Sequence, residues 1–219
     1  MSKTIFSPKQ SALRDLYANL MLEVRHRIDL VSSLVQGSYG LPKLAAYELC
    51  YLQFRMICEL IALSALAAHG DIPATRSGKM REAYKADWIL NEMEKLHPDF
   101  YPKPGRQVRG ADGQVLEVVP ITSGFMSKRD LLKLYHESGS LLHRGAMKDL
   151  SDRKAGNFWR IGHVAQSIVT LLNHHQIALS DPQYQLWVIM KAESDNKVHA
   201  TVMQGVSRGL LDGQPPRVN

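Results

Sequence analysis

Residues 49–68 read LCYLQFRMICELIALSALAA, and this stretch decides the fold. It is apolar on nearly every side, which is typical of a central helix with neighbours all around. We expect one helix from about Pro42 to His69, stopped by Gly70. Its most apolar part, Met56 to Ala68, contains Glu59 and is shorter than the ~20 residues of a membrane span. The stretch therefore predicts a core helix, not a membrane anchor.

Four further helices are indicated on either side of this stretch by apolar positions spaced three and four apart. Ser7-Pro8 is a favourable helix start. Ser127 can cap another helix, with Asp130 three residues on as in a capping box. The four expected helices run from Pro8 to the turn at Gly37, from Gly78 to Leu96, from Lys128 to His143, and from Asn157 to Ala178.

Two β-hairpins are predicted outside the helices. Asp112-Gly113 separates RQVR from VLEVV in a segment rich in Pro and Gly, which indicates an exposed basic hairpin at about 104–121. Near the C-terminus, QLWVIM and KVHATVM flank a polar turn, and the alternation in the second run is typical of a strand.

The predicted fold class is therefore mainly α: a helical bundle of about five helices with an inserted β-hairpin and a C-terminal β-hairpin. The expected organisation is a bundle domain over residues 1–180, a hairpin packed on it over 181–205, and a flexible tail over 206–219.

Composition indicates a globular chain of a reducing compartment. Apolar residues make up 45% and charged residues 22%, which is ordinary for a folded domain. Cys50 and Cys58 are eight positions apart in one expected helix, so roughly 12 Å of axis separates them and they cannot pair. Met1 to Gln10 has no apolar signal-peptide core. We expect a cytoplasmic protein without a membrane partner.

The positive charge is concentrated in the middle of the chain. The net charge is +6, and residues 102–160 hold eleven Lys or Arg against six Asp or Glu. A basic region attracts nucleic acid or nucleotides, which makes Arg106 and Arg109 of the inserted hairpin candidate binding residues. A solvated basic face explains the same excess, and both interpretations stay open.

Arg55 and Glu59 are the first candidates for chemistry. They are four positions apart, so they share a helix face and can pair. A charge in such an apolar helix needs partners. The pair either fixes the register of the core helix or lines a polar site.

The string SGSLLHRG, residues 138–145, supplies the second candidates. His143 and Arg144 stand at an expected helix end, where the helix dipole alone favours a His. The functional alternative makes His143 a general base or a phosphate contact, with Arg144 steadying the anion. The chain lacks zinc-type spacings, and the adjacent His174 and His175 point different ways. We therefore expect no metal and no cofactor.

The run of long helices, with SGSLLHRG closing the fourth, resembles the HEPN superfamily over roughly residues 8–178. That resemblance implies a helical bundle, often a homodimer, of the kind found as RNases or nucleotide-binding partners in microbial defence and toxin systems. Active members carry Arg, then four to six residues, then His, at a helix end. His143 matches the His, but the position of the Arg, near Glu137 or Ser138, is not basic.

The sequence accordingly favours binding over catalysis. The first hypothesis is a non-catalytic, HEPN-like module that binds RNA, a nucleotide or a protein partner. The alternatives are an RNase that uses His143 with Arg55, Glu59 and Arg144, and a structural or regulatory assembly subunit.

Overall fold

The computed structural model describes residues 8–111, 113–143 and 156–204. The predicted tail at 206–219 and Arg144 lie outside this part of the chain. The helices are α1 (Pro8–Val35), α2 (Lys43–Ala68), the short 3₁₀ helix η1 (Pro73–Arg76), α3 (Gly78–Arg81), α4 (Ala86–Leu96), α5 (Lys128–Leu142) and α6 (Phe158–Leu172). The strands are β1 (Lys103–Arg109), β2 (Val115–Pro120), β3 (His174–Ala178), β4 (Tyr184–Ile189) and β5 (His199–Gln204).

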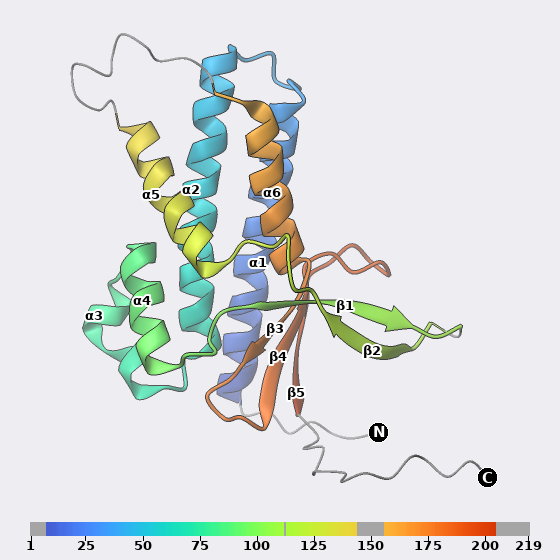
Figure 1. Cartoon of the computed structure of the whole chain (residues 1–219). Coiled ribbons are helices and arrows are strands. Elements are labelled where there is room, and N and C mark those ends of the chain that lie inside the picture. Colours follow the sequence, from blue (N-terminus) through green and yellow to red (C-terminus); the bar gives the residue numbers. More distant parts are fainter. Residues whose placement is uncertain (1–7, 112, 144–155, 205–219) are drawn as a thin grey trace.

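The apolar helix α2 lies at the centre of the bundle, as its sequence predicts. It packs against α1, α4 and α5 (Figure 1), and Phe54, Ile57 and Cys58 are fully buried. By length and composition α2 is also the one helix of the described residues that could cross a membrane, but 61% of its most apolar window is buried inside the protein. Burial of this apolar surface stabilises the fold.

Helix α5 begins and ends where the sequence predicts. The side-chain oxygen of Ser127 accepts a hydrogen bond from the backbone N–H of Asp130, which satisfies one of the free donors at the helix start. His143 is the residue that closes the helix, and its backbone N–H donates to the Gly139 carbonyl.

The single helix predicted over 78–96 is wrong. The chain forms a four-residue helix α3, leaves helical geometry at residues 82–85, and starts α4 at Ala86. Residues EAYK at 82–85 carry no Pro or Gly, so nothing local marks the break. The break turns the chain so that α4 buries Ile89, Leu90 and Met93.

The prediction of a helix through Ala178 is also wrong. Helix α6 ends at Leu172, and the next residues form strand β3. Strand β3 pairs antiparallel with β1 on one side and with β4 on the other. The run HHQIA is too short for its periodicity to decide between helix and strand, so the pairing partners on both sides determine its conformation.

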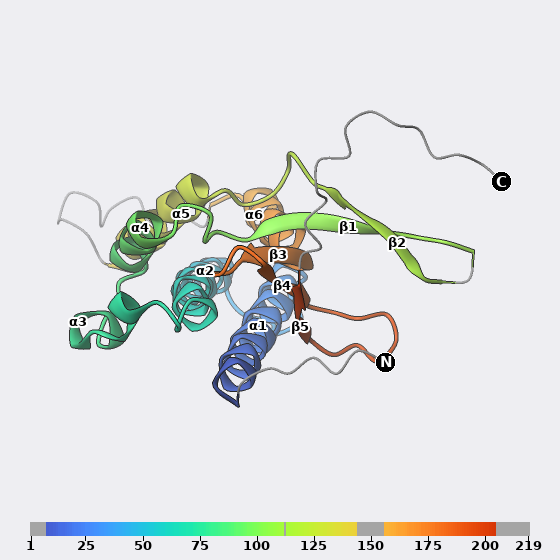
Figure 2. The same ribbon diagram turned by 90° about the horizontal axis from the view of Figure 1, so that it is seen from below.

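The two predicted hairpins exist, but they belong to one sheet. The strand order is β2-β1-β3-β4-β5, and every neighbouring pair is antiparallel. The protein is therefore a mixed α/β fold, a helical bundle with a five-stranded antiparallel sheet, rather than a bundle with two separate hairpins. Figure 2 shows the outer part of the β1–β2 hairpin extending away from the helices.

Candidate functional site

Arg55 and Glu59 form the predicted pair, with 3.4 Å between Arg55 Nε and Glu59 Oε1. Arg55 Nη2 also donates to the Tyr135 hydroxyl at 3.0 Å, and the guanidinium lies over the Tyr135 ring, 4.4 Å from its centre. A Cβ on Gly139 would approach Arg55 Nη1 to 2.7 Å, so this glycine leaves the guanidinium room in the α2–α5 seam. Three interactions therefore hold Arg55 in the packing of these two helices.

His143 lies further along α5 than the residues that contact Arg55. It is four positions beyond Gly139, one helical turn nearer the end of the helix, and its side chain is exposed. The structure thus brings Arg55 and Glu59 together and places His143 at the helix end. Arg144 lies outside the described residues.

A second polar cluster, beside Arg55, could not be predicted from the sequence. Glu137 of α5 accepts a hydrogen bond from the Tyr51 hydroxyl at 3.3 Å and pairs with Arg160 of α6, with 2.6 Å between Nη2 and Oε2. Tyr47 and Tyr51 lie four positions apart on α2, and their rings are 5.0 Å apart. The cluster joins α2, α5 and α6, and each of its charges has a partner.

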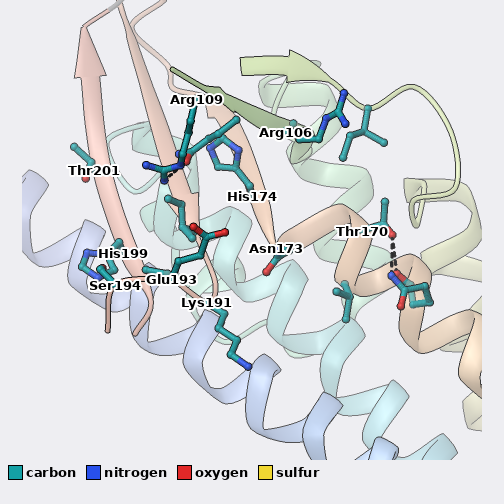
Figure 3. Close-up of a pocket in the computed structure, with 17 residues that line it drawn as sticks. Arg106, Arg109, Thr170, Asn173, His174, Lys191, Glu193, Ser194, His199 and Thr201 are labelled. Atoms are coloured by element: carbon teal, nitrogen blue, oxygen red, sulfur yellow. Dashed lines mark hydrogen bonds between the residues drawn. The ribbon is translucent and has the colours of Figure 1, made fainter. Parts of the chain in front are cut away.

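The basic hairpin residues lie at a different place, on a hollow of about 1070 Å³ between the sheet and α6. Arg106 and Arg109 of β1 and Lys191, which follows β4, all line this hollow. Figure 3 shows Arg109 beside His174, whereas the side chains of Arg106 and Lys191 extend away from His174 at opposite ends of the hollow. Within the described residues, neither Arg106 nor Lys191 has an ion-pair partner, and Arg109 donates only to neutral oxygens, those of Gly113 and Gln107. Three cations from two distant segments therefore share one concave surface.

His174 is the buried polar residue of the hollow. Its side chain lines the hollow, and only 8% of the residue is exposed. Both ring nitrogens lack a hydrogen-bond partner among the described residues. Burial lowers the pKa of His174, and the nearby positive charge of Arg109 lowers it too, whereas a weak hydrogen-bonding interaction with the Gly105 backbone, outside normal hydrogen-bond geometry, raises it. A neutral ring offers one donor and one acceptor, so His174 can bind a polar ligand group.

The remaining lining residues add polar groups and one carboxylate. Thr170 and Asn173 belong to the last turn of α6 and its end, and Glu193 and His199 come from the β4–β5 connection and β5. His199 is hydrogen-bonded to Asp195, with 3.0 Å between Nε2 and Oδ1. With three Lys or Arg against the single carboxylate of Glu193, the hollow has a net positive charge and favours an anionic ligand.

The sequence pointed to part of this hollow. Arg106 and Arg109 were predicted as binding residues, and the structure places both on it. Lys191 and His174 were missed, because the first lies outside the basic region 102–160 and the second was assigned to a helix. In the described residues, no three His, Cys, Asp or Glu side chains gather closely enough to hold a metal ion.

Comparison of the chain with protein-family models, with curated proteins and with solved structures finds no match. The resemblance to the HEPN superfamily therefore stays a prediction.

Proposed function

We propose that this chain is a binding module for RNA, and that the hollow between the sheet and α6 holds phosphate groups of the RNA. The observation that carries the proposal is the meeting of Arg106, Arg109 and Lys191 on one concave surface that also contains the unpartnered ring of His174. Lys and Arg neutralise phosphates and release counterions, which supplies most of the affinity of sequence-independent binding. Arginine forks also match phosphate geometry.

The contacts of the Arg55 guanidinium favour binding of RNA over its cleavage. An RNase needs a cation that can reach the phosphate, whereas the Arg55 guanidinium is held by Glu59 and by the hydroxyl and ring of Tyr135. The proposal is therefore a non-catalytic module. A place in microbial defence or toxin–antitoxin systems, the assembly-subunit alternative and a homodimer all stay predictions.

The test is fluorescence anisotropy with a labelled single-stranded RNA, comparing two double variants with the same change of charge. Arg106→Glu with Arg109→Glu reverses two cations of the hollow. Arg81→Glu with Lys85→Glu reverses two exposed cations at α3 and the start of α4, on the side of the molecule away from the hairpin (Figures 1 and 2).

The first variant should lose about tenfold or more in affinity and the second less than about twofold at moderate salt, because only the first removes phosphate contacts. Equal losses in both variants would mean that the RNA responds only to net charge. Wild-type protein that binds no RNA at low salt would contradict the proposed function itself.

A further inference from the structure

Neither ring nitrogen of His174 makes a hydrogen bond of normal geometry within the described residues, although the Gly105 backbone interacts with the ring. Successive side chains of a strand point to opposite faces, and the neighbouring His175 is fully buried, with its Nε2 2.7 Å from the Tyr17 hydroxyl. His174 therefore faces away from that contact, and it lines the hollow. A buried polar group without a well-formed hydrogen bond destabilises the folded protein, so a ligand explains this ring better than a role in folding does.

The charge around His174 defines the kind of ligand group that suits it. Arg109 is close enough to lower the pKa of the His174 ring, and Arg106 and Lys191 line the same hollow. A phosphate monoester carries about −1.5 to −2 charges near pH 7 and three acceptor oxygens. It can therefore engage Arg109 and one ring donor of His174 together, while Arg106 and Lys191 add positive charge at the two ends of the hollow.

The burial of His174 favours a terminal phosphate of an RNA chain over an internal phosphodiester. A phosphodiester continues into the chain on two sides, so both neighbouring nucleotides must be accommodated wherever it binds. A phosphate monoester is attached on one side only, so it can protrude into a hollow and reach a recessed group. Only 8% of His174 is exposed, and both ring nitrogens are covered. Contact with the ring therefore needs a side-chain movement and a group that enters the hollow deeply, which favours the terminal group.

The other wall of the hollow suits the rest of a nucleotide. Ile121 and Val169 provide apolar surface, and Thr170 and Asn173 provide hydroxyl and amide groups. Ligand sites commonly combine apolar walls with a few placed polar groups. The volume of about 1070 Å³ lies just above the range of common ligand pockets.

We infer that the hollow recognises a phosphate monoester on a ribose, with His174 as the recessed hydrogen-bonding group, Arg109 as the cation beside it, and Arg106 and Lys191 as cations at the two ends of the hollow. This inference rests on the proposed RNA binding and specifies its ligand: the phosphorylated end of an RNA or, with the same chemistry, a free nucleoside monophosphate.

The experiment measures binding of one short RNA sequence in three forms: with a 5′-phosphate, with a 3′-phosphate, and with hydroxyl groups at both ends. A nucleoside monophosphate is added as a competitor in a further series. Wild-type protein should bind one phosphorylated form about tenfold or more tightly than the hydroxyl form, and His174→Gln should abolish that preference while keeping residual RNA binding. The matched control is His163→Gln, an exposed histidine of α6 that does not line the hollow.

Folding of each variant is checked by circular dichroism, and Lys191→Gln provides a second variant at an exposed position. It should reduce the same preference, so the inference stays testable if His174→Gln does not fold. Competition by the mononucleotide at the affinity of the phosphorylated RNA would make the free nucleotide the preferred source.

Equal binding of all three RNA forms would overturn this inference and leave the proposed RNA binding intact. Absence of RNA binding together with binding of the mononucleotide would overturn the proposed function and support the phosphate site. A preference that survives in both His174→Gln and Lys191→Gln would place the phosphate elsewhere and contradict the inference.

Discussion

The hydroxyl of Tyr17 on α1 lies 2.7 Å from Nε2 of His175 on β3. On the other side of the ring, Nδ1 of His175 is 2.8 Å from the Leu172 carbonyl oxygen. A carbonyl only accepts, so Nδ1 carries the proton and donates, and Nε2 of the neutral ring accepts from Tyr17. This pair fixes the sheet to the first helix and sets which face of β3 turns toward the hollow.

Tyr17→Phe should lower the free energy of unfolding by about 1–3 kcal/mol at pH 7.5. The change leaves a buried acceptor, Nε2 of His175, without its donor. Denaturant melts measure the loss. Tyr84→Phe is the control, because Tyr84 is 71% exposed, and it should change stability by less than about 0.5 kcal/mol. Equal effects of the two changes would mean that the Tyr17–His175 contact does not stabilise the fold.

Stability should also fall in acid because of His175. Burial lowers the pKa of His175 from its ordinary value of about 6.5 to about 4 in the folded protein. The neutral ring is therefore favoured on folding, and its contribution is complete above pH 6.5 and is lost as the pH falls toward 4. The difference corresponds to about 2 kcal/mol between pH 7.5 and pH 5.

Urea melts at several pH values test this acid dependence. The side chain in His175→Gln is neutral at every pH, so the variant should start less stable and lose less stability between pH 7.5 and pH 5. The pKa values of His69 and His174 are also lowered, first of all by burial, and they give the part of the acid loss that remains in the variant. An unchanged acid dependence in His175→Gln would contradict the assignment to this ring.

Several local signals in the sequence placed their elements correctly. The apolar run of α2, the Ser127 cap of α5 and the turn at Gly113 each act within a few residues, and each was placed correctly. Strand β3 was missed because its conformation depends on pairing with β1 and β4, which are distant in the chain. The same strand joins the two hairpins into one sheet, because it pairs with β1 on one side and with β4 on the other.

The residues of the hollow could likewise be predicted only where the signal was local. Arg106 and Arg109 belong to one basic hairpin, and their charge is visible in composition. Lys191 is a single lysine in a mixed segment, and only the sheet topology brings it to the same surface. The side on which His174 lies depends on its being in a strand. Residue spacing in the sequence indicates neither the position of Lys191 nor the side on which His174 lies.

Arg55→Met should cost about 1–3 kcal/mol of stability, because Glu59 and Tyr135 lose their partner in a half-buried seam. Denaturant melts measure this loss.

The RNase alternative, which uses His143, is tested by a cleavage assay. We expect no cleavage of labelled single-stranded RNA by wild-type protein. Cleavage by wild-type protein that disappears in a well-folded His143→Ala variant would establish the enzyme instead.

The central claim is that distant segments form one binding surface for RNA phosphates, and Lys191 tests it most directly. Lys191→Gln, Arg106→Gln and Arg81→Gln each remove one exposed charge, and the RNA affinity of each is measured by anisotropy over a range of salt. The account predicts that Lys191→Gln weakens binding as much as Arg106→Gln, by roughly five- to tenfold, and lowers the salt slope by about 0.7. Arg81→Gln should behave like wild type. If Lys191→Gln also binds like wild type while Arg106→Gln does not, the hairpin alone contacts RNA and the shared hollow is contradicted.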